Sequence, residues 1–279
     1  MASAQDRKSQ FPEPVDVSLK TRGEPDGSSV ELTATYYRSN AGTNAPVVML
    51  LHMQGRDRRD WASFAATLQS ADFAVLALDL RGHGDSKVTR QGATEPISPD
   101  QMRKEDYANM YFDLEAAKRF LLEKNNAREL NVEKLGVVAA EMSTPVAVRW
   151  AQEDWNWEAL PGLGKQGKDV KALVLITPHW SYQGVDIRES LPVLRGYEKL
   201  AMLFIAGQKD RRSMRDAMRM FDVVHSHNKE KTEGKGYDTS LTGTMMLGKD
   251  LPLEEDVIKF LTEHLKNASE PWTDRSKNR

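Results

Sequence analysis

Five continuous apolar runs, separated by amphipathic segments of helix length, constrain the fold of this 279-residue chain more than any other feature. Runs that are apolar at nearly every position are typical of strands buried on both faces. The intervening segments carry apolar residues at a spacing of three to four, which predicts helices. The sequence therefore predicts an α/β fold with a doubly wound, mostly parallel twisted sheet and helices on both faces. The runs are PVVMLLH (46–52), FAVLALDL (73–80), LGVVAA (135–140), KALVLIT (171–177) and AMLFIAG (201–207).

The two ends of the chain differ from this pattern. Residues 1–14 and 266–279 are polar and contain prolines, which predicts weakly ordered tails on either side of one domain over residues 15–265. Residues 15–21 and 30–37 alternate apolar with polar side chains around a stretch rich in Gly, Pro and Ser. That pattern favours two antiparallel strands joined by a turn.

Composition excludes several classes of function. Lys and Arg total 39 against 41 for Asp and Glu, so the chain has no overall attraction to nucleic acid or to an anionic membrane. The absence of cysteine removes disulfides, thiolate nucleophiles and cysteine-bound metals. Motifs for zinc, phosphate-loop and dinucleotide sites are missing, so we expect neither a metal nor a cofactor. With no signal-like or membrane-length apolar run we expect a soluble protein, cytoplasmic by default, although a removed signal peptide would leave no trace.

Two motifs stand at the carboxyl ends of predicted strands, where open α/β sheets bind ligands. They are H-x-x-G at residues 52–55 and D-x-R-G-H-G-x-S at residues 79–86. Together with a strand-turn-helix at Glu141 and the order of elements, they make residues 15–265 resemble the α/β-hydrolase superfamily. The resemblance implies hydrolysis of ester or amide bonds by a nucleophile, an acid and a histidine base.

The nucleophile position of that family is occupied by Glu141. In the family the third of these strands ends in G-x-S-x-G, with the serine on a strained turn between small residues. Here the frame is Ala139-Ala140-Glu141-Met142-Ser143. The small flanking residues predict that the turn is kept and its serine replaced. The resemblance also implies an oxyanion hole formed by the backbone N–H groups of Gln54 and Met142, and we expect Ser143 to be a capping hydroxyl.

The other two catalytic positions give a weaker match. Asp210 follows the last apolar run at the position of the acid, but an aspartate there is more commonly the N-cap of the next helix. Thr242 falls where the family has its histidine, and residues 228–263 contain none. The resemblance therefore implies a catalytic triad without its general base.

Three roles for Glu141 stay open at this stage. Its carboxylate could attack a substrate, although the ester formed would persist without a base. It could activate water directly, which requires a raised pKa that burial favours and the helix dipole opposes. It could also cap its helix or bind Arg56 or Arg81 in a cleft that no longer catalyses.

Cleft residues are expected beside Glu141, and His179 is the one histidine worth testing as a base, although a structural use is favoured. Residues 178–201 are too few for a helical lid, so we expect an open cleft for a small molecule or a protein. The resulting hypothesis is a catalytically silent or very weak hydrolase homologue with a binding role. The alternative is an active esterase or peptidase that uses Glu141. The cleft set is His52, Met53, His179, Trp180 and Tyr182.

Overall fold

A computed structural model describes residues 11–276 apart from 26, 28, 90–95 and 163. Most of the predicted N-terminal tail, residues 1–10, lies outside the described residues. The strands are β1 (Val15–Lys20), β2 (Glu31–Tyr37), β3 (Pro46–Leu51), β4 (Ala74–Leu78), β5 (Asn131–Ala140), β6 (Val170–Ile176), β7 (Ser181–Tyr182), β8 (Val185–Asp186), β9 (Ala201–Gly207) and β10 (Thr232–Tyr237). The α-helices are α2 (Ala62–Ser70), α3 (Lys104–Ala108), α4 (Met110–Asn126), α5 (Ser143–Asn156), α6 (Ser190–Leu194), α7 (Arg211–His225) and α8 (Leu253–Leu261).

Eight of the strands form one mixed sheet in the order β1-β2-β4-β3-β5-β6-β9-β10. Strands β1 and β2 pair antiparallel, as does β2 with β4, and every other neighbouring pair is parallel. Each of the five apolar runs forms a strand of this sheet, β3, β4, β5, β6 and β9. The predicted fold class and the antiparallel opening are therefore confirmed.

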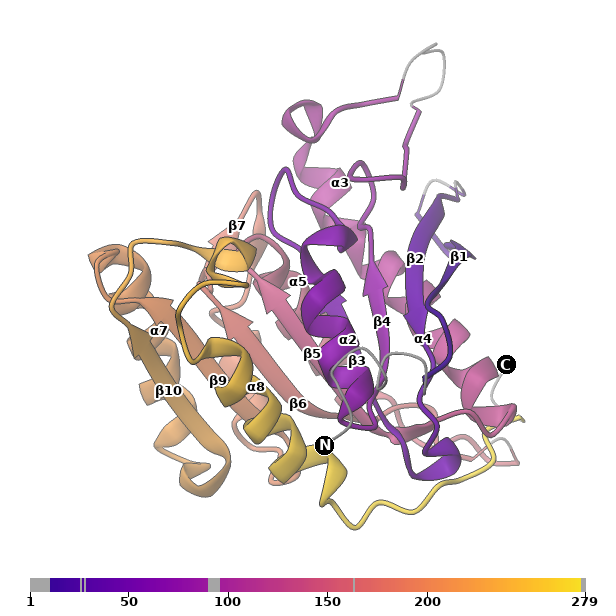
Figure 1. Cartoon of the computed structure of the whole chain (residues 1–279). Helices are drawn as coiled ribbons and strands as arrows, with labels where there is room; N and C mark the ends of the chain where they lie inside the picture. Colours follow the sequence, from indigo (N-terminus) through magenta and orange to yellow (C-terminus); the bar gives the residue numbers. More distant parts are fainter. Residues whose placement is uncertain (1–10, 26, 28, 90–95, 163, 277–279) are drawn as a thin grey trace.

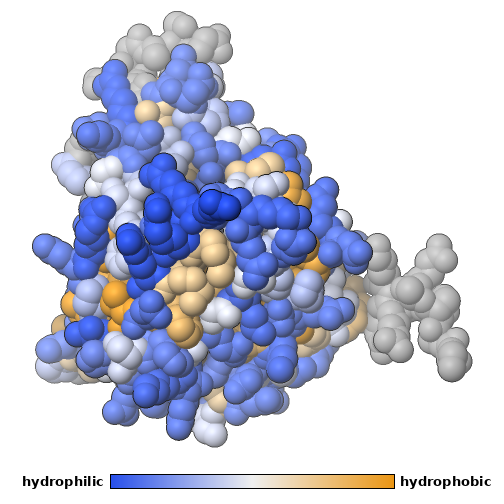
Figure 2. Space-filling view, turned by 90° about the vertical axis from the view of Figure 1, so that its left-hand side faces the viewer, coloured by the Kyte–Doolittle hydropathy of each residue, from blue (hydrophilic) through white to orange (hydrophobic). Residues whose placement is uncertain are grey.

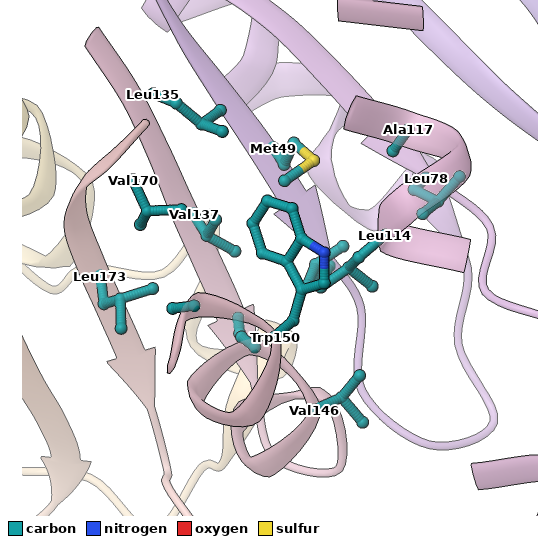
Figure 3. Close-up of a cluster of buried hydrophobic side chains, with 14 of the residues drawn as sticks. Met49, Leu78, Leu114, Ala117, Leu135, Val137, Val146, Trp150, Val170 and Leu173 are labelled. Atoms are coloured by element: carbon teal, nitrogen blue, oxygen red, sulfur yellow. The ribbon is translucent and has the colours of Figure 1, made fainter. Parts of the chain in front are cut away.

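Helices cover both faces of the sheet (Figure 1). Buried apolar side chains form two clusters, one on each face of the sheet. Helices α4, α5 and α7 pack on the larger cluster, and α2 and α8 pack on the smaller one. The larger cluster centres on Trp150 of α5, which lies against strand residues such as Met49 and Val137 and against Leu114 of α4 (Figure 3). The Trp150 indole N–H donates to Glu115 Oε1 at 2.6 Å, so the one polar atom of this side chain is satisfied.

The C-terminal residues after the π-helical turn Thr262–Lys266 pack against the domain as far as the structure describes them. The Arg275 guanidinium is only 3% exposed and pairs with Glu133 at 3.0 Å and Asp169 at 2.8 Å. The expectation of a loosely attached end omitted these contacts, because they join side chains more than a hundred residues apart in sequence. The boundary of the domain at residue 265 stays a prediction.

Across the described ranges, no helix combines the length and the apolar composition needed to cross a lipid bilayer.

Candidate active site

The backbone turns sharply at Glu141, between the end of β5 and the start of α5. Glu141 has a φ of 51°, a left-handed conformation that is uncommon for any residue with a side chain and typical of a nucleophile elbow. Its N–H donates to Ile176 O at 2.9 Å, and its carbonyl accepts the N–H and the hydroxyl of Thr144. These bonds fix the turn, so the carboxylate of Glu141 is presented where the sequence placed it.

Ser143 supports this turn from below. Its hydroxyl oxygen lies 3.0 Å from Ala140 N, from which it accepts, and within 3.2 Å of the carbonyl oxygens of Leu51 and Ala140. The side chain is fully buried against the strand ends, as predicted. The prediction that it caps the helix is wrong, because its partners belong to β3 and β5 and no side chain caps the start of α5.

The two motifs that carried the resemblance hold the loop after β3 in place. Fully buried His52 bonds Met53 O through Nδ1 and accepts the Leu80 N–H at Nε2, and burial lowers its pKa to about 4. Asp79 accepts the backbone N–H of Arg58 at 2.7 Å and also binds the Arg58 guanidinium. His52 thus packs beneath the loop that presents Gln54, and its hydrogen bonds join that loop to the residues after β4.

In the second motif, the position of Gly84 leaves no room for a side chain. Its φ is +52°, and an added Cβ would lie 2.2 Å from the Asp79 carboxylate. The carboxylate also accepts the Asp85 N–H at 2.8 Å. The glycine therefore lets this turn close around Asp79, which ties the two loops together.

The Glu141 carboxylate is half-buried, and few neighbouring groups stabilise its negative charge. Burial raises its pKa above the ordinary value, while the backbone N–H of Gln54 opposes that rise. Oε2 is buried, with no hydrogen-bond partner among the described residues. The effect of burial, left open by the sequence, therefore outweighs that of the neighbouring amide.

Neither arginine proposed as a partner of Glu141 binds it. Arg56 pairs with Asp60 at 2.9 Å. Arg81 pairs with Glu24 at 2.9 Å and with Asp113 at 2.7 Å. The interpretation that Glu141 binds one of these cations is therefore wrong, since both guanidinium groups already have acidic partners.

Two tyrosines enclose the site, and one of them was not predicted. Burial and the proximity of Tyr107 and Glu141 raise the pKa of Tyr182 to about 12. The rings of Tyr107 and Tyr182 meet edge to face, with centroids 5.5 Å apart. The Tyr107 hydroxyl donates to Gln54 Oε1 at 3.1 Å, and Gln54 Nε2 donates to Pro99 O at 2.9 Å. Tyr107 was missed because it lies on a helix and does not follow an apolar run.

Asp210 is the N-cap of α7. Its carboxylate accepts the backbone N–H groups of Arg212 and Ser213 at 3.1 and 3.2 Å and the Ser213 hydroxyl at 2.6 Å. Hydrogen bonding from Ser213 lowers the pKa of Asp210. The favoured prediction of a helix cap is confirmed.

Thr242 precedes the short 3-10 helix Gly243–Met246. The Gly243 N–H donates to Thr177 Oγ1 at 2.9 Å, and a Cβ at Gly243 would lie 2.8 Å from the Met53 sulfur. This loop therefore lies next to the loop of Met53 and Gln54, on the same edge of the sheet as Glu141.

His179 lies beside this site, with its ring centroid 5.7 Å from that of Tyr182. Its backbone N–H donates to Thr144 Oγ1 at 3.1 Å. Burial lowers the pKa of its ring, as does Arg212, while Asp216 and Asp210 oppose the change. The charged groups that influence His179 are thus on α7. Trp180, half-buried like His179, packs against the larger apolar cluster.

One group of side chains has the donor types of a metal site. Glu233, Glu263 and His264 each offer a ligand atom, and these atoms lie within 4.8 Å of one another. Glu233 belongs to the amino-terminal half of β10, whereas Glu141 follows the carboxyl end of β5. The group is therefore separate from the candidate active site.

Comparisons with known proteins agree with this geometry. No family model matches the chain. Over 85 residues, it is 39% identical to protein phosphatase methylesterase 1 of Bos taurus and 38% identical to that of Homo sapiens. Each match covers 29% of this chain and only 21% of the relative, so the chain aligns with about a fifth of the length of these proteins.

Solved structures match over nearly the whole chain. An esterase of Pyrococcus furiosus superposes with a TM-score of 0.61 at 18% identity, covering 95% of both chains. A thermostable carboxyl esterase of Bacillus coagulans superposes with a TM-score of 0.65 at 12% identity, covering 91% of this chain and 99% of the esterase. At such low identity the likeness carries the fold alone. The chain therefore has the α/β-hydrolase fold, the fold of these esterases, with Glu141 at the turn that follows β5.

Proposed function

We infer that this protein is a catalytically silent or very weak hydrolase homologue whose open cleft has a binding role. The observation that carries this proposal is the surroundings of Glu141. None of the six histidines of the chain hydrogen-bonds its carboxylate, and none is among the groups that shift its pKa. A carboxylate that attacked the acyl carbon of an ester would form a mixed anhydride and release the alcohol, and turnover would need a base that activates the water that hydrolyses the anhydride.

The positions equivalent to the other triad members support the same conclusion. The Asp210 carboxylate already accepts three hydrogen bonds at the start of α7. Thr242 carries no group that could accept a proton at neutral pH. Triad members act as a unit, and loss of the unit leaves roughly 10³ to 10⁴ over the uncatalysed rate from the oxyanion hole and substrate binding.

A second candidate function is direct hydrolysis with Glu141 as the general base. The raised pKa of its half-buried carboxylate favours this role, because a base acts best when its pKa lies near the working pH. Oε2 is buried and has no hydrogen-bond partner among the described residues, so one acceptor oxygen of the proposed base is not engaged by the protein.

Hydrolysis of a panel of nitrophenyl esters by the wild type, Glu141→Gln and Glu158→Gln separates the two functions. Glu158 is an exposed carboxylate and controls for the loss of one negative charge. A silent protein shows the same residual rate in all three forms. If Glu141 is the base, the Glu141→Gln variant alone loses activity, and the wild-type rate rises with pH as the carboxylate ionises.

A further inference from the structure

A cavity of about 720 Å³ opens between helix α7 and the segment that follows β6. Its wall includes Arg212, Asp216 and Arg219 of α7, which share one face of that helix because they are spaced by four and three residues. Arg188, which follows the β7–β8 hairpin, also lines the cavity. Three arginines therefore contribute to one cavity wall.

Arg188 differs from the other two arginines in its ion pairing, because it is bound to Asp186, outside the wall of the cavity. For Arg212 and Arg219, no hydrogen bond or ion pair involves the side chain within the described ranges. The wall also holds one carboxylate, Asp216, which lies 3.9 Å from Arg215, and the charge of Arg212 acts on Asp210 at the start of α7. With more arginines than acids, the wall keeps a net positive charge that suits an anion.

Part of the wall is apolar. Trp180, Pro192 and Val223 contribute to it, and Trp180 and Val223 are themselves only partly buried against the core. Figure 2 views the molecule from the side on which α7 and β10 lie, where hydrophilic side chains break the surface into small apolar areas. A small ligand with an apolar part fits this surface better than an extended apolar partner.

This cavity is distinct from the turn at Glu141. Neither Glu141, Gln54 nor Tyr107 contributes to its wall. His179 and Trp180, both expected in the cleft beside Glu141, also line the cavity and link the two. A ligand in the cavity would therefore lie next to the candidate active site without requiring the Glu141 carboxylate.

We propose that this cavity binds an organic phosphate monoester, with the phosphate held by Arg212 and Arg219 and the apolar body placed against Trp180 and Pro192. A phosphate monoester carries nearly two negative charges at neutral pH and three acceptor oxygens, which two guanidinium forks can satisfy. A carboxylate carries one charge and would leave one guanidinium without an anionic partner. The function proposed for Glu141 is not needed for this inference.

Isothermal titration calorimetry with phenyl phosphate tests the site in the wild type and in the single variants Arg212→Ala and Arg219→Ala. Each substitution should weaken binding by about tenfold or more, since a hydrogen-bonded charge contributes at least ~1.4 kcal/mol. Arg211→Ala is the matched control, because Arg211 is exposed, adjacent in sequence and absent from the cavity wall. Glu141→Gln should leave the affinity unchanged, which separates this result from the fate of the proposed function.

Three further ligands test the two halves of the proposal. These three ligands should bind more weakly than phenyl phosphate. Inorganic phosphate lacks the apolar body, benzoate lacks the second negative charge, and benzyl alcohol lacks any charge. Absence of phenyl phosphate binding to the wild type would overturn the site. So would an equal loss in Arg211→Ala and Arg219→Ala, which indicates general charge attraction, or equal affinity for benzoate. Circular dichroism confirms that each variant is folded.

Discussion

The proposed function depends on Glu141, whose half-buried carboxylate lies on a left-handed turn. The sequence correctly predicted the turn at Glu141, because the small residues around it leave room for a sharp bend. It could not predict whether the side chain is desolvated. Desolvation depends on the loops that pack around the carboxylate, among them those that carry Gln54 and Tyr182, and sequence spacing says nothing of how closely those loops pack.

Glu141→Gln should make the folded protein more stable at pH 7. The pKa of Glu141 is raised in the folded state, so the folded protein holds the proton more tightly than the unfolded chain and the ionised form is destabilising. The advantage of the amide should shrink as pH falls through the folded-state pKa and vanish below 4.5, the value for an unperturbed glutamate. Urea denaturation at pH 7 and pH 4 measures it.

Glu158→Gln serves as the control for this comparison, because it removes one exposed negative charge elsewhere. A Glu141→Gln variant that is less stable than the wild type at pH 7 would show that the carboxylate has a partner that stabilises its charge.

Helix α7 begins directly after Asp210, which caps the helix. Asp210 follows β9 at the place where the resemblance puts an acid, and its three hydrogen bonds all go to the first turn of α7. The sequence alone favoured the cap on the frequency of aspartate at helix starts. The structure supplies the partners.

Asp210→Ala should lower the free energy of unfolding by about 1 kcal/mol, the usual cost of losing an N-cap. Because the Asp210 pKa is lowered in the folded state, its contribution is present above the ordinary value of 3.8 and is lost as pH falls through the folded-state pKa. Asp210→Asn keeps a capping oxygen and should lose much less. Equal stability of Asp210→Ala and wild type at pH 7 would contradict the cap.

Elements buried on both faces were predicted from the sequence, whereas the edge strand β10 was not. Strand β10 reads TEGKGY, with two glycines and no apolar run, because it lies at the edge of the sheet. The amphipathic segment that precedes the third apolar run forms two helices, α3 and α4, which are divided at Asn109. Apolar periodicity continues across that residue, so the pattern carried no sign of the break.

Across the described part of the molecule, buried ion pairs hold together segments that lie far apart in sequence. Lys118 and Asp169 lie 3.1 Å apart, and Asp169 also binds Arg275 near the C-terminus. These groups are buried, and the attraction of Lys118 and Arg275 holds the pKa of Asp169 well below its usual range against the effect of burial. Pairings between residues that lie so far apart in sequence leave no local signature, which is why the sequence did not predict them.

The fold was predicted more fully than the site, because the site depends on contacts between segments that are distant in sequence. The α/β-hydrolase fold follows from five buried strands and the loops that His52 and Asp79 hold together. The site adds Tyr107 from α3 and His179 from the segment after β6, and only the folded chain brings them near Glu141. We therefore propose that the chain keeps the α/β-hydrolase fold and that its reactive groups have been exchanged.

Intact-mass analysis after incubation with a fluorophosphonate, on the wild type and on the double variant Glu141→Ser with Thr242→His, shows whether restoring the serine and the histidine restores a reactive nucleophile. We expect the wild type to gain no mass and the double variant to gain one phosphonyl group, because the proposal requires that the elbow and the oxyanion loop are kept. A phosphonylated wild type, or a folded double variant that stays unlabelled, would contradict it.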